Sequence, residues 1–237
     1  APAAFTDTEF YQKSFDPREY LKEFYGFSDS RGQPNAVLTQ NLRSLLRMFS
    51  LDGLTGNTLI DVGCGPTIYQ LLSACERFQE IIALDCTDQN RRELEKWLRN
   101  EEGAFDWSPV VKYVCELEGD REKWAEKEEK LSKKVRRVLK CDVTKANPVG
   151  PVSLPPADCI ISTFCLEAAC KDLGNFRSAL SNISGLVKPG GHLVLLTALG
   201  ESYYAFNEQV FSCLRLGRGD VEAAVTGAGF AVEFGEV

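Results

Sequence analysis

The stretch Thr58-Leu59-Ile60-Asp61-Val62-Gly63-Cys64-Gly65-Pro66-Thr67-Ile68-Tyr69 decides the fold that we expect. Residues 58–62 form a short, mainly apolar and β-branched run, which predicts a buried strand. Gly63 and Gly65 then allow a tight turn close to a ligand, because neither residue carries a Cβ. Pro66 and the later apolar residues Ile68, Leu71 and Leu72 predict a helix after this turn. A strand, a glycine turn and a helix form the first unit of a nucleotide-binding α/β domain.

Two further positions restrict the kinds of ligand that this turn could bind. A dinucleotide fingerprint would have a third glycine where this chain has Ile68, so a pyrophosphate ligand is disfavoured. Residues 80–85 predict a second strand that ends in Asp85, roughly twenty residues beyond the turn, where a carboxylate can bind both ribose hydroxyls. The turn by itself leaves a purely structural role open.

The rest of the chain alternates predicted helices and strands. A helix starts at Pro17 with Asp16 as its N-cap, and a helix over 89–100 has Asp88 as its N-cap. Further helices are expected over 110–117, 125–131, 175–186 and 221–227, with a turn over 105–109 and a chain-breaking run over 188–191. Further strands are expected over 138–143, 157–164, 192–198 and 230–237. This alternation predicts an α/β fold with a mostly parallel, doubly wound sheet.

The composition excludes several classes of protein. A length of 237 residues suits one α/β domain, and a formal net charge of −7 argues against a nucleic-acid partner. The nine cysteines include no Cys-x-x-Cys pair and His192 is the one histidine, so we expect free thiols and no metal site. We find no signal peptide and no apolar run that could span a bilayer. These features predict a soluble protein of the cytoplasm, and we expect a monomer.

In this sequence Asp61 precedes the glycine turn and Asp85 follows the second predicted strand. This arrangement resembles the cofactor site of S-adenosylmethionine (SAM) dependent methyltransferases. Four longer runs resemble the small-amine N-methyltransferases, a family that contains the nicotinamide, indolethylamine and phenylethanolamine enzymes. They are Asp-Val-Gly-Cys-Gly-Pro-Thr-Ile-Tyr-Gln-Leu-Leu-Ser-Ala-Cys (61–75), Glu-Leu-Glu-Lys-Trp-Leu (93–98), Phe-Asp-Trp-Ser-Pro (105–109) and Leu-Pro-Pro-Ala-Asp-Cys (154–159). The similarity extends from Phe5 to about Val237.

This resemblance implies one Rossmann-like methyltransferase domain over residues 1–237, with a helical lid (1–50) and a core (51–237). In the family, a final strand inserts antiparallel into the sheet after the point where this sequence stops. We therefore expect either a shortened sequence or an exposed edge beside the strand at 230–237. In the phenylethanolamine branch the missing tail also supplies a substrate-binding acid.

The resemblance further implies SAM as the methyl donor, with S-adenosylhomocysteine as the product. It implies that Tyr20 and Tyr25 are lid residues that contact the cofactor, where their aromatic rings can stabilise a sulfonium. It also implies that Asp142 and Val143 bind the adenine of the cofactor. From the residues alone, the aromatic helix could instead cap the sheet, and Asp142 could be a helix N-cap. The other expected cofactor contacts are Gly63, Cys64, Gly65, Thr67, Tyr69, Asp85, Asn90 and Thr163.

Two glutamates are candidates for the catalytic acids. Methyl transfer needs alignment of donor and acceptor, but an aliphatic amine also arrives protonated and must lose a proton to a carboxylate. Glu167 and Glu201 follow the fourth and fifth strands, at the edge where open α/β sheets bind ligands. Either could be an ordinary loop acid, but their surroundings resemble the phenylethanolamine branch, in which both acids face the amine.

The residues expected around the substrate are Phe164, Ala168, Thr197, Ala198, Tyr204 and Cys213. The nicotinamide branch has aspartate and serine at positions 197 and 213, so carboxamide recognition is disfavoured here. At Cys213 and His192 this sequence resembles the indolethylamine branch. Asn41 stands where the phenylethanolamine branch has a lysine in its second helix. We expect methylation of a small arylalkylamine, an indolethylamine such as tryptamine or a phenylethanolamine. Nicotinamide N-methylation is the alternative reaction, and a non-catalytic SAM-binding regulator is the alternative of another class.

Overall fold

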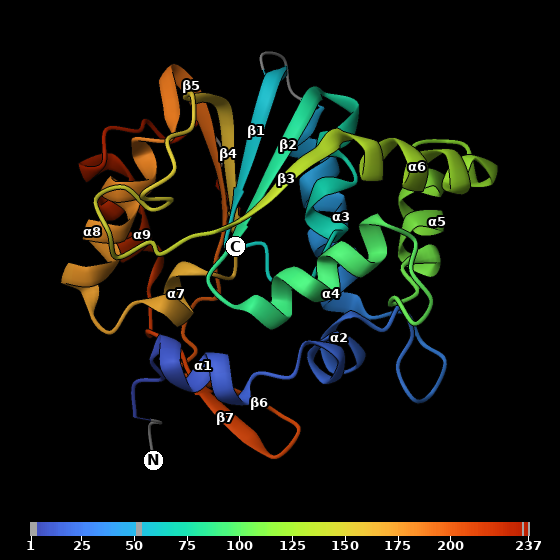
Figure 1. Ribbon diagram of the computed structural model, residues 1–237, viewed down its shortest axis with the longest axis horizontal. Coiled ribbons are helices and arrows are strands. Elements are labelled where there is room, and N and C mark those ends of the chain that lie inside the picture. Colours follow the sequence, from blue (N-terminus) through green and yellow to red (C-terminus); the bar gives the residue numbers. More distant parts are fainter. Residues whose placement is uncertain (1–3, 51–53, 234, 237) are drawn as a thin grey trace.

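The computed structural model describes residues 4–50, 54–233, 235 and 236 (Figure 1). Within these residues, a five-stranded parallel sheet has the strand order β3-β2-β1-β4-β5. Its strands are β1 (Gly56–Val62), β2 (Phe78–Asp85), β3 (Val135–Lys140), β4 (Ala157–Thr163) and β5 (Val187–Leu196). The predicted α/β fold with a mostly parallel, doubly wound sheet is confirmed.

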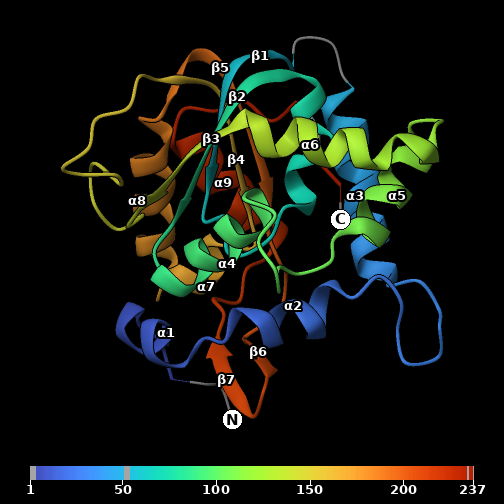
Figure 2. The same cartoon turned by 45° about the vertical axis from the view of Figure 1, so that its right-hand side comes forward.

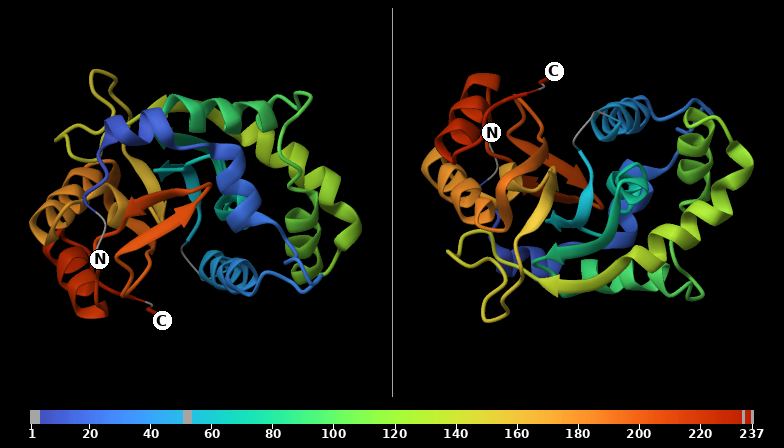
Figure 3. Two further views of the ribbon diagram at one scale, coloured as in Figure 1. Left: turned by 90° about the horizontal axis from the view of Figure 1, so that it is seen from below. Right: turned by 90° about the horizontal axis from the view of Figure 1, so that it is seen from above.

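Helices cover both faces of the sheet (Figure 3). One face carries α3 (Ala36–Phe49), α4 (Asp88–Leu98), α5 (Ser108–Leu117) and α6 (Trp124–Lys134), and the other carries α8 (Leu173–Ser184) and α9 (Arg218–Gly227). A hydrophobic core lies on each face of the sheet, and successive side chains of β1 point into opposite cores. Leu59 packs against the first group of helices and Ile60 against the second. The parallel strands place their carboxyl ends at one edge, where Val62 of β1 lies opposite Leu84 of β2.

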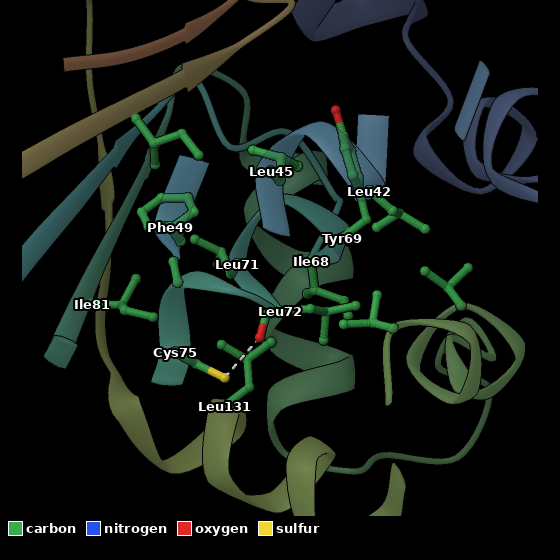
Figure 4. Close-up of a cluster of buried hydrophobic side chains, with 14 of the residues drawn as sticks. Leu42, Leu45, Phe49, Ile68, Tyr69, Leu71, Leu72, Cys75, Ile81 and Leu131 are labelled. Carbon is green, nitrogen blue, oxygen red and sulfur yellow. Dashed lines mark hydrogen bonds between the residues drawn. The ribbon is translucent and has the colours of Figure 1, made fainter. Parts of the chain in front are cut away.

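The segment after the glycine turn is not the predicted α-helix. It forms two short 3₁₀ turns, η1 (Tyr69–Leu71) and η2 (Ala74–Glu76). Every residue from 66 to 75 is buried, so the segment has no solvent-facing side. Its apolar side chains pack among those of α3, β2 and α6 (Figure 4). The apolar residues at 68, 71 and 72 therefore reflect a segment that is buried on all sides, and not the apolar face of an amphipathic helix.

Several element boundaries differ from the predicted ones. The third strand is β3, so residues 141–143 lie beyond its end. Thr87 caps α4 in place of Asp88, which is the first helical residue, and α5 begins within the predicted turn over 105–109. Residues 188–191 lie inside β5, because a register shift between Ala157 and Cys159 accommodates them.

Two predictions near the C-terminus were incomplete or wrong. Sequence analysis missed the antiparallel hairpin of β6 (Tyr203–Phe206) and β7 (Gln209–Ser212), as well as the short helix α7 (Leu166–Ala169). The predicted strand at 230–237 is absent from the described residues 230–233, 235 and 236, where 231–233 are exposed and pair with no strand. Phe234 and Val237 lie outside the described residues.

Two N-terminal helices lie across the carboxyl ends of the strands, together with the β6–β7 hairpin (Figures 1 and 2). They are α1 (Thr8–Ser14) and α2 (Pro17–Tyr25), and Asp16 caps α2 as predicted. The helices and the hairpin share an aromatic cluster of Phe15, Phe206 and Phe211, against which Tyr11, Tyr20, Phe24 and Tyr204 pack. None of the helices in the described ranges is long and apolar enough to cross a membrane.

Candidate active site

Gly63 and Gly65 shape the turn that follows β1. Both residues adopt a left-handed backbone conformation, with φ of +74° and +56°. A Cβ at Gly63 would lie 2.2 Å from the Sγ atom of Cys165, so a side chain there would collide with the start of α7. Gly65 donates its backbone N–H to Asp85 Oδ1 at 3.0 Å, and Cys64 donates its backbone N–H to the Leu84 carbonyl at 2.8 Å. The turn is thereby fixed against the end of β2.

Asp85 presents a buried carboxylate at the end of β2. Its Oδ2 accepts hydrogen bonds from the backbone N–H and the hydroxyl of Thr87 and from Asn90 Nδ2, each at 3.1 Å. Burial raises the pKa of Asp85, and these hydrogen bonds oppose the shift. The Oδ1 atom of Asn90 is buried and has no partner within the described chain. An acceptor is thus open to a ligand beside the carboxylate predicted to bind ribose.

A buried polar network lies under the same turn. Gln70 donates Nε2 to Asp61 Oδ2 at 2.8 Å, and the Thr67 hydroxyl lies 2.8 Å from Gln70 Oε1. Burial raises the pKa of Asp61 to about 7, and Asp61 Oδ1 has no partner among the described residues. A carboxylate with an open buried oxygen suits a cationic group of a ligand. Sequence analysis missed Gln70, although it is the one polar side chain in the apolar run 68–72.

Three tyrosine rings lie together where helix α2 meets the turn. Tyr25 stacks on Tyr69 with ring centroids 5.0 Å apart, and the hydroxyls of Tyr20 and Tyr25 are 3.4 Å apart. Burial raises the pKa of Tyr69, which the nearby hydroxyls of Thr163 and Tyr25 partly oppose. Burial also raises the pKa of Tyr20, and Glu167 and Asp85 are close enough to add to that shift.

Glu167 is a buried carboxylate on α7, with a relative exposure of 2%. Its Oε2 accepts hydrogen bonds from the Thr197 hydroxyl at 2.9 Å and from the Ala198 backbone N–H at 2.6 Å. Its Oε1 is buried and accepts no hydrogen bond from another described residue. Burial raises the pKa of Glu167, and the bonds from Ala198 and Thr197 oppose this. One oxygen of the carboxylate is thus held by two hydrogen bonds, and the other is buried without a partner in the described residues.

Glu201 differs from Glu167 because its side chain is exposed, between β5 and the hairpin. Burial, followed by the charges of Glu167 and Glu201, raises the pKa of Cys213 to about 12. The hydroxyls of Tyr204 on the hairpin and Tyr11 on α1 share a hydrogen bond, with the two oxygens 2.5 Å apart. Sequence analysis missed Tyr11, whose only signal was its place in an aromatic-rich segment.

Comparison with known proteins identifies the family. The sequence matches the NNMT/PNMT/TEMT family over residues 3–237. It is 57% identical to the nicotinamide N-methyltransferase of Sus scrofa over 99% of this chain and 89% of that protein. It is 50% identical to the indolethylamine N-methyltransferase of Oryctolagus cuniculus (97% and 87% covered) and 42% identical to the phenylethanolamine N-methyltransferase of Homo sapiens (98% and 83% covered). The chain belongs to the NNMT/PNMT/TEMT family. It is a SAM-dependent small-molecule N-methyltransferase.

Solved structures support the fold of this enzyme. The magnesium protoporphyrin IX methyltransferase of Synechocystis PCC 6803 with bound SAH superposes with a TM-score of 0.55 at 14% identity, covering 94% of this chain and 88% of that chain. A SAM-dependent methyltransferase of Clostridium acetobutylicum gives a TM-score of 0.52 at 10% identity, covering 80% and 79%. These similarities concern the fold alone.

The remaining predicted site residues of the enzyme lie at the same edge of the sheet. Asp142 accepts hydrogen bonds on Oδ1 from the Thr144 backbone N–H at 3.0 Å and its hydroxyl at 2.6 Å, in a turn and not at a helix N-terminus. Phe164 follows β4 with a φ of +51°, a strained conformation that occurs often at functional sites. Val143 is buried beyond β3, and Ala168 lies in α7 beside Glu167.

The open polar atoms at this edge fit SAM. Asn90 Oδ1 and Asp61 Oδ1 are buried acceptors without partners in the described ranges, and the rings of Tyr20 and Tyr25 on α2 lie 5.5 Å apart, with that of Tyr25 stacked on Tyr69 beyond the turn. SAM carries hydroxyl, amino and sulfonium groups that such acceptors and rings can bind. Among the described residues, no group of three or more His, Cys, Asp or Glu side chains could hold a metal ion.

Proposed function

We propose that the enzyme methylates the amine of a small arylalkylamine, with an indolethylamine such as tryptamine ahead of a phenylethanolamine. The observation that carries this proposal is the open Oε1 atom of Glu167, a buried carboxylate oxygen without a partner in the described chain. Leaving a buried charged group unpaired is costly, so its natural complement is a cationic ligand. An arylalkylammonium supplies that charge, whereas the ring nitrogen of nicotinamide is neutral.

Glu167 can also receive the proton that the ammonium must lose. Burial raises the pKa of Glu167, which makes its carboxylate a stronger base than an exposed glutamate. Thr197 and the Ala198 backbone hold Oε2, so the ligand-facing oxygen is fixed in place. We assign Glu167 the role of binding the amine and accepting its proton, and Glu201 the role of a second acid at the rim.

The proposed cofactor site uses the opposite side of the same edge. In this proposal Asp85 and Asn90 bind the ribose of SAM, and Asp142 and Val143 bind its adenine. The turn over 63–67 contacts the rest of the SAM molecule. Tyr20, Tyr25 and Tyr69 would surround the sulfonium, with Thr163 beside them. Bound SAM supplies an activated methyl group, and the residues of the chain supply alignment and the proton acceptor. In this assignment residues 1–50 are the lid of a single methyltransferase domain over 1–237.

The substrate pocket would combine Phe164, Ala168, Thr197, Ala198, Tyr204 and Cys213. Thr197 supports an amine over a carboxamide because its hydroxyl is already hydrogen-bonded to Glu167. The alternative substrate is nicotinamide, which the 57% and 55% identities to proteins named nicotinamide N-methyltransferase favour. The net charge of −7 and the nine free cysteines support a protein of a reducing cytoplasm without a nucleic-acid partner, and we expect a monomer.

A panel of acceptors tests the proposal directly. Purified enzyme and methyl-labelled SAM are incubated with tryptamine, phenylethanolamine and nicotinamide, and labelled products are quantified. We expect the highest kcat/KM on tryptamine. A higher kcat/KM on nicotinamide would establish the alternative, and no product with any acceptor would favour a non-catalytic SAM-binding protein.

A further inference from the structure

Helix α4 contacts the two N-terminal helices along one of its faces (Figure 2). Gln89 and Glu93, four residues apart, share this face because a helix repeats about every 3.6 residues. Gln89 contacts α1 and Glu93 contacts α2. The lid is therefore attached to α4 at two successive turns of the helix.

The contact between α2 and α4 is a partly buried ion pair. Arg18 donates Nε and Nη2 to Glu93 Oε1 at 2.8 and 2.6 Å, and Nη2 also donates to the Gly103 carbonyl. The Glu93 side chain is 6% exposed, and that of Arg18 is 33% exposed. The guanidinium carbon lies 6.0 Å from the centre of the Phe105 ring. Hydrogen bonds between charged partners are stronger than neutral ones, so the Arg18–Glu93 pair is a strong polar attachment of α2 to α4.

The contact between α1 and α4 is made by amide groups. Gln89 Nε2 donates to the backbone carbonyls of Tyr11, Gln12 and Phe15 at 2.8, 3.0 and 3.2 Å. Gln12 Nε2 in turn donates to Gln89 Oε1 at 3.1 Å. Gln89 therefore adds hydrogen bonds to carbonyls in the last turn of α1 and at its C-cap, where intrahelical donors run out; the Tyr11 carbonyl also accepts from the Phe15 backbone N–H at 3.0 Å.

The first turn of α4 also holds the cofactor carboxylate. Thr87, the N-cap of α4, donates two hydrogen bonds to Asp85 Oδ2, and Asn90 donates a third. Asn90 thus lies next to Gln89 in sequence and one turn before Glu93. One helix connects the proposed ribose site to both attachments of the lid.

We propose that Arg18 and Glu93 are a pair of positioning residues that latch the lid onto α4 and set the rate at which SAM leaves. This inference rests on the proposed role of Tyr20 and Tyr25 in covering the cofactor. Release of SAM requires α2 to move away, and that movement must break the Arg18–Glu93 pair. The pair does not touch the reacting atoms, so its loss should alter cofactor exchange more than the chemical step.

The experiment uses Arg18→Met, Glu93→Gln and the double variant. Methionine keeps an unbranched stem against Phe105, and glutamine keeps the shape of the glutamate. Arg121→Met is the matched control, because Arg121 forms an exposed ion pair with Glu116 at 3.2 Å on another part of the surface. The SAM dissociation rate is measured by displacement with excess S-adenosylhomocysteine in stopped flow, without any amine, alongside Tm.

Each latch variant should release SAM about tenfold faster, as expected for the loss of a charge-assisted hydrogen bond. The double variant should lose less than the sum of the two single variants, because the Arg18–Glu93 interaction is lost in all three. The single-turnover rate at saturating SAM and amine should change less than twofold or so if only cofactor exchange is affected. Arg121→Met should dissociate SAM at the wild-type rate.

An unchanged dissociation rate in all latch variants would overturn the proposal, as would additive effects in the double variant. A lower Tm with an unchanged dissociation rate would show that the pair is purely structural. Tyr20→Ala separates this failure from that of the lid assignment. If Tyr20→Ala weakens SAM binding and the latch variants do not, only the latch is wrong; if neither does, the lid assignment is wrong as well.

Discussion

Asp85 and Glu167 are both buried carboxylates at the carboxyl edge of the sheet, yet their hydrogen bonding differs. Asp85 accepts four hydrogen bonds that involve both of its oxygens. Glu167 accepts two, both on Oε2, and its Oε1 has no partner in the described residues. On the cofactor side, the Asp85 carboxylate is therefore fully hydrogen-bonded by the chain itself, whereas on the acceptor side the Glu167 carboxylate keeps one oxygen that only a ligand with a donor or a positive charge could satisfy.

The two sides meet at Gly63, whose replacement should have the largest effect. In Gly63→Ala the new Cβ would collide with Cys165 at the start of α7, in a backbone conformation that already disfavours alanine. We expect a loss of about 3 kcal/mol or more in the free energy of unfolding, with weakened binding of both SAM and the amine. Urea unfolding and SAM titration measure both effects.

Gly65→Ala is the matched control for this change. A Cβ at Gly65 has no heavy atom within 4 Å, although its φ is also positive. The expected cost is about 1–2 kcal/mol, from the backbone conformation alone. Equal losses in the two variants would contradict the idea that contact with Cys165 joins the two sides.

Asp85→Ala should have the next largest effect. It removes the acceptor of Gly65, Thr87 and Asn90 as well as the proposed partner of the ribose hydroxyls. We expect SAM affinity to fall about tenfold and the free energy of unfolding to fall by about 1–3 kcal/mol, because buried donors lose their partners. Calorimetric titration and thermal unfolding provide the two values. Wild-type SAM affinity would exclude Asp85 from the cofactor site.

Glu167→Gln should change stability in the opposite direction, by about 1 kcal/mol. Burial raises the folded-state pKa of Glu167 above that of the unfolded chain, so the folded protein binds more protons and its contribution to stability declines as pH rises between these two values. The glutamine variant should lack this decline and be the more stable protein above the folded-state pKa. Unfolding curves between pH 5 and pH 8 test this, and a less stable variant across that range would refute it.

The smallest effect is expected for the lid hydroxyls. Tyr20→Phe and Tyr25→Phe retain the rings that face the cofactor site, so SAM affinity should fall only about twofold to threefold, whereas alanine at either position should cost more. Both series are compared by SAM titration. Equal losses with phenylalanine and alanine would assign the tyrosines a hydrogen-bonding role.

The fold and the cofactor side were predictable because their signals are local. The run 58–62, the two glycines and Asp85 lie close together in sequence and need only one strand–turn–strand unit to act together. The helix expected after the turn was wrong because apolar spacing cannot distinguish a segment buried on one side from one buried on all sides.

The acceptor side was less predictable because it depends on distant contacts. From the sequence, Glu167 and Glu201 looked equivalent, because each follows a predicted strand. Only tertiary packing buries Glu167 and leaves Glu201 exposed. The β6–β7 hairpin had a usable signal: Tyr204 and Phe206 alternate with more exposed residues before a turn at Asn207 and Glu208, which both adopt positive φ.

The central claim is that Glu167 serves an amine that must lose a proton. Its most direct test compares kcat/KM for tryptamine and nicotinamide in the wild-type enzyme and in Glu167→Gln. We predict that the wild type prefers tryptamine, that the variant loses about 10²-fold on tryptamine, and that any activity on nicotinamide changes little. A wild-type preference for nicotinamide, or full tryptamine activity in Glu167→Gln, would contradict the account.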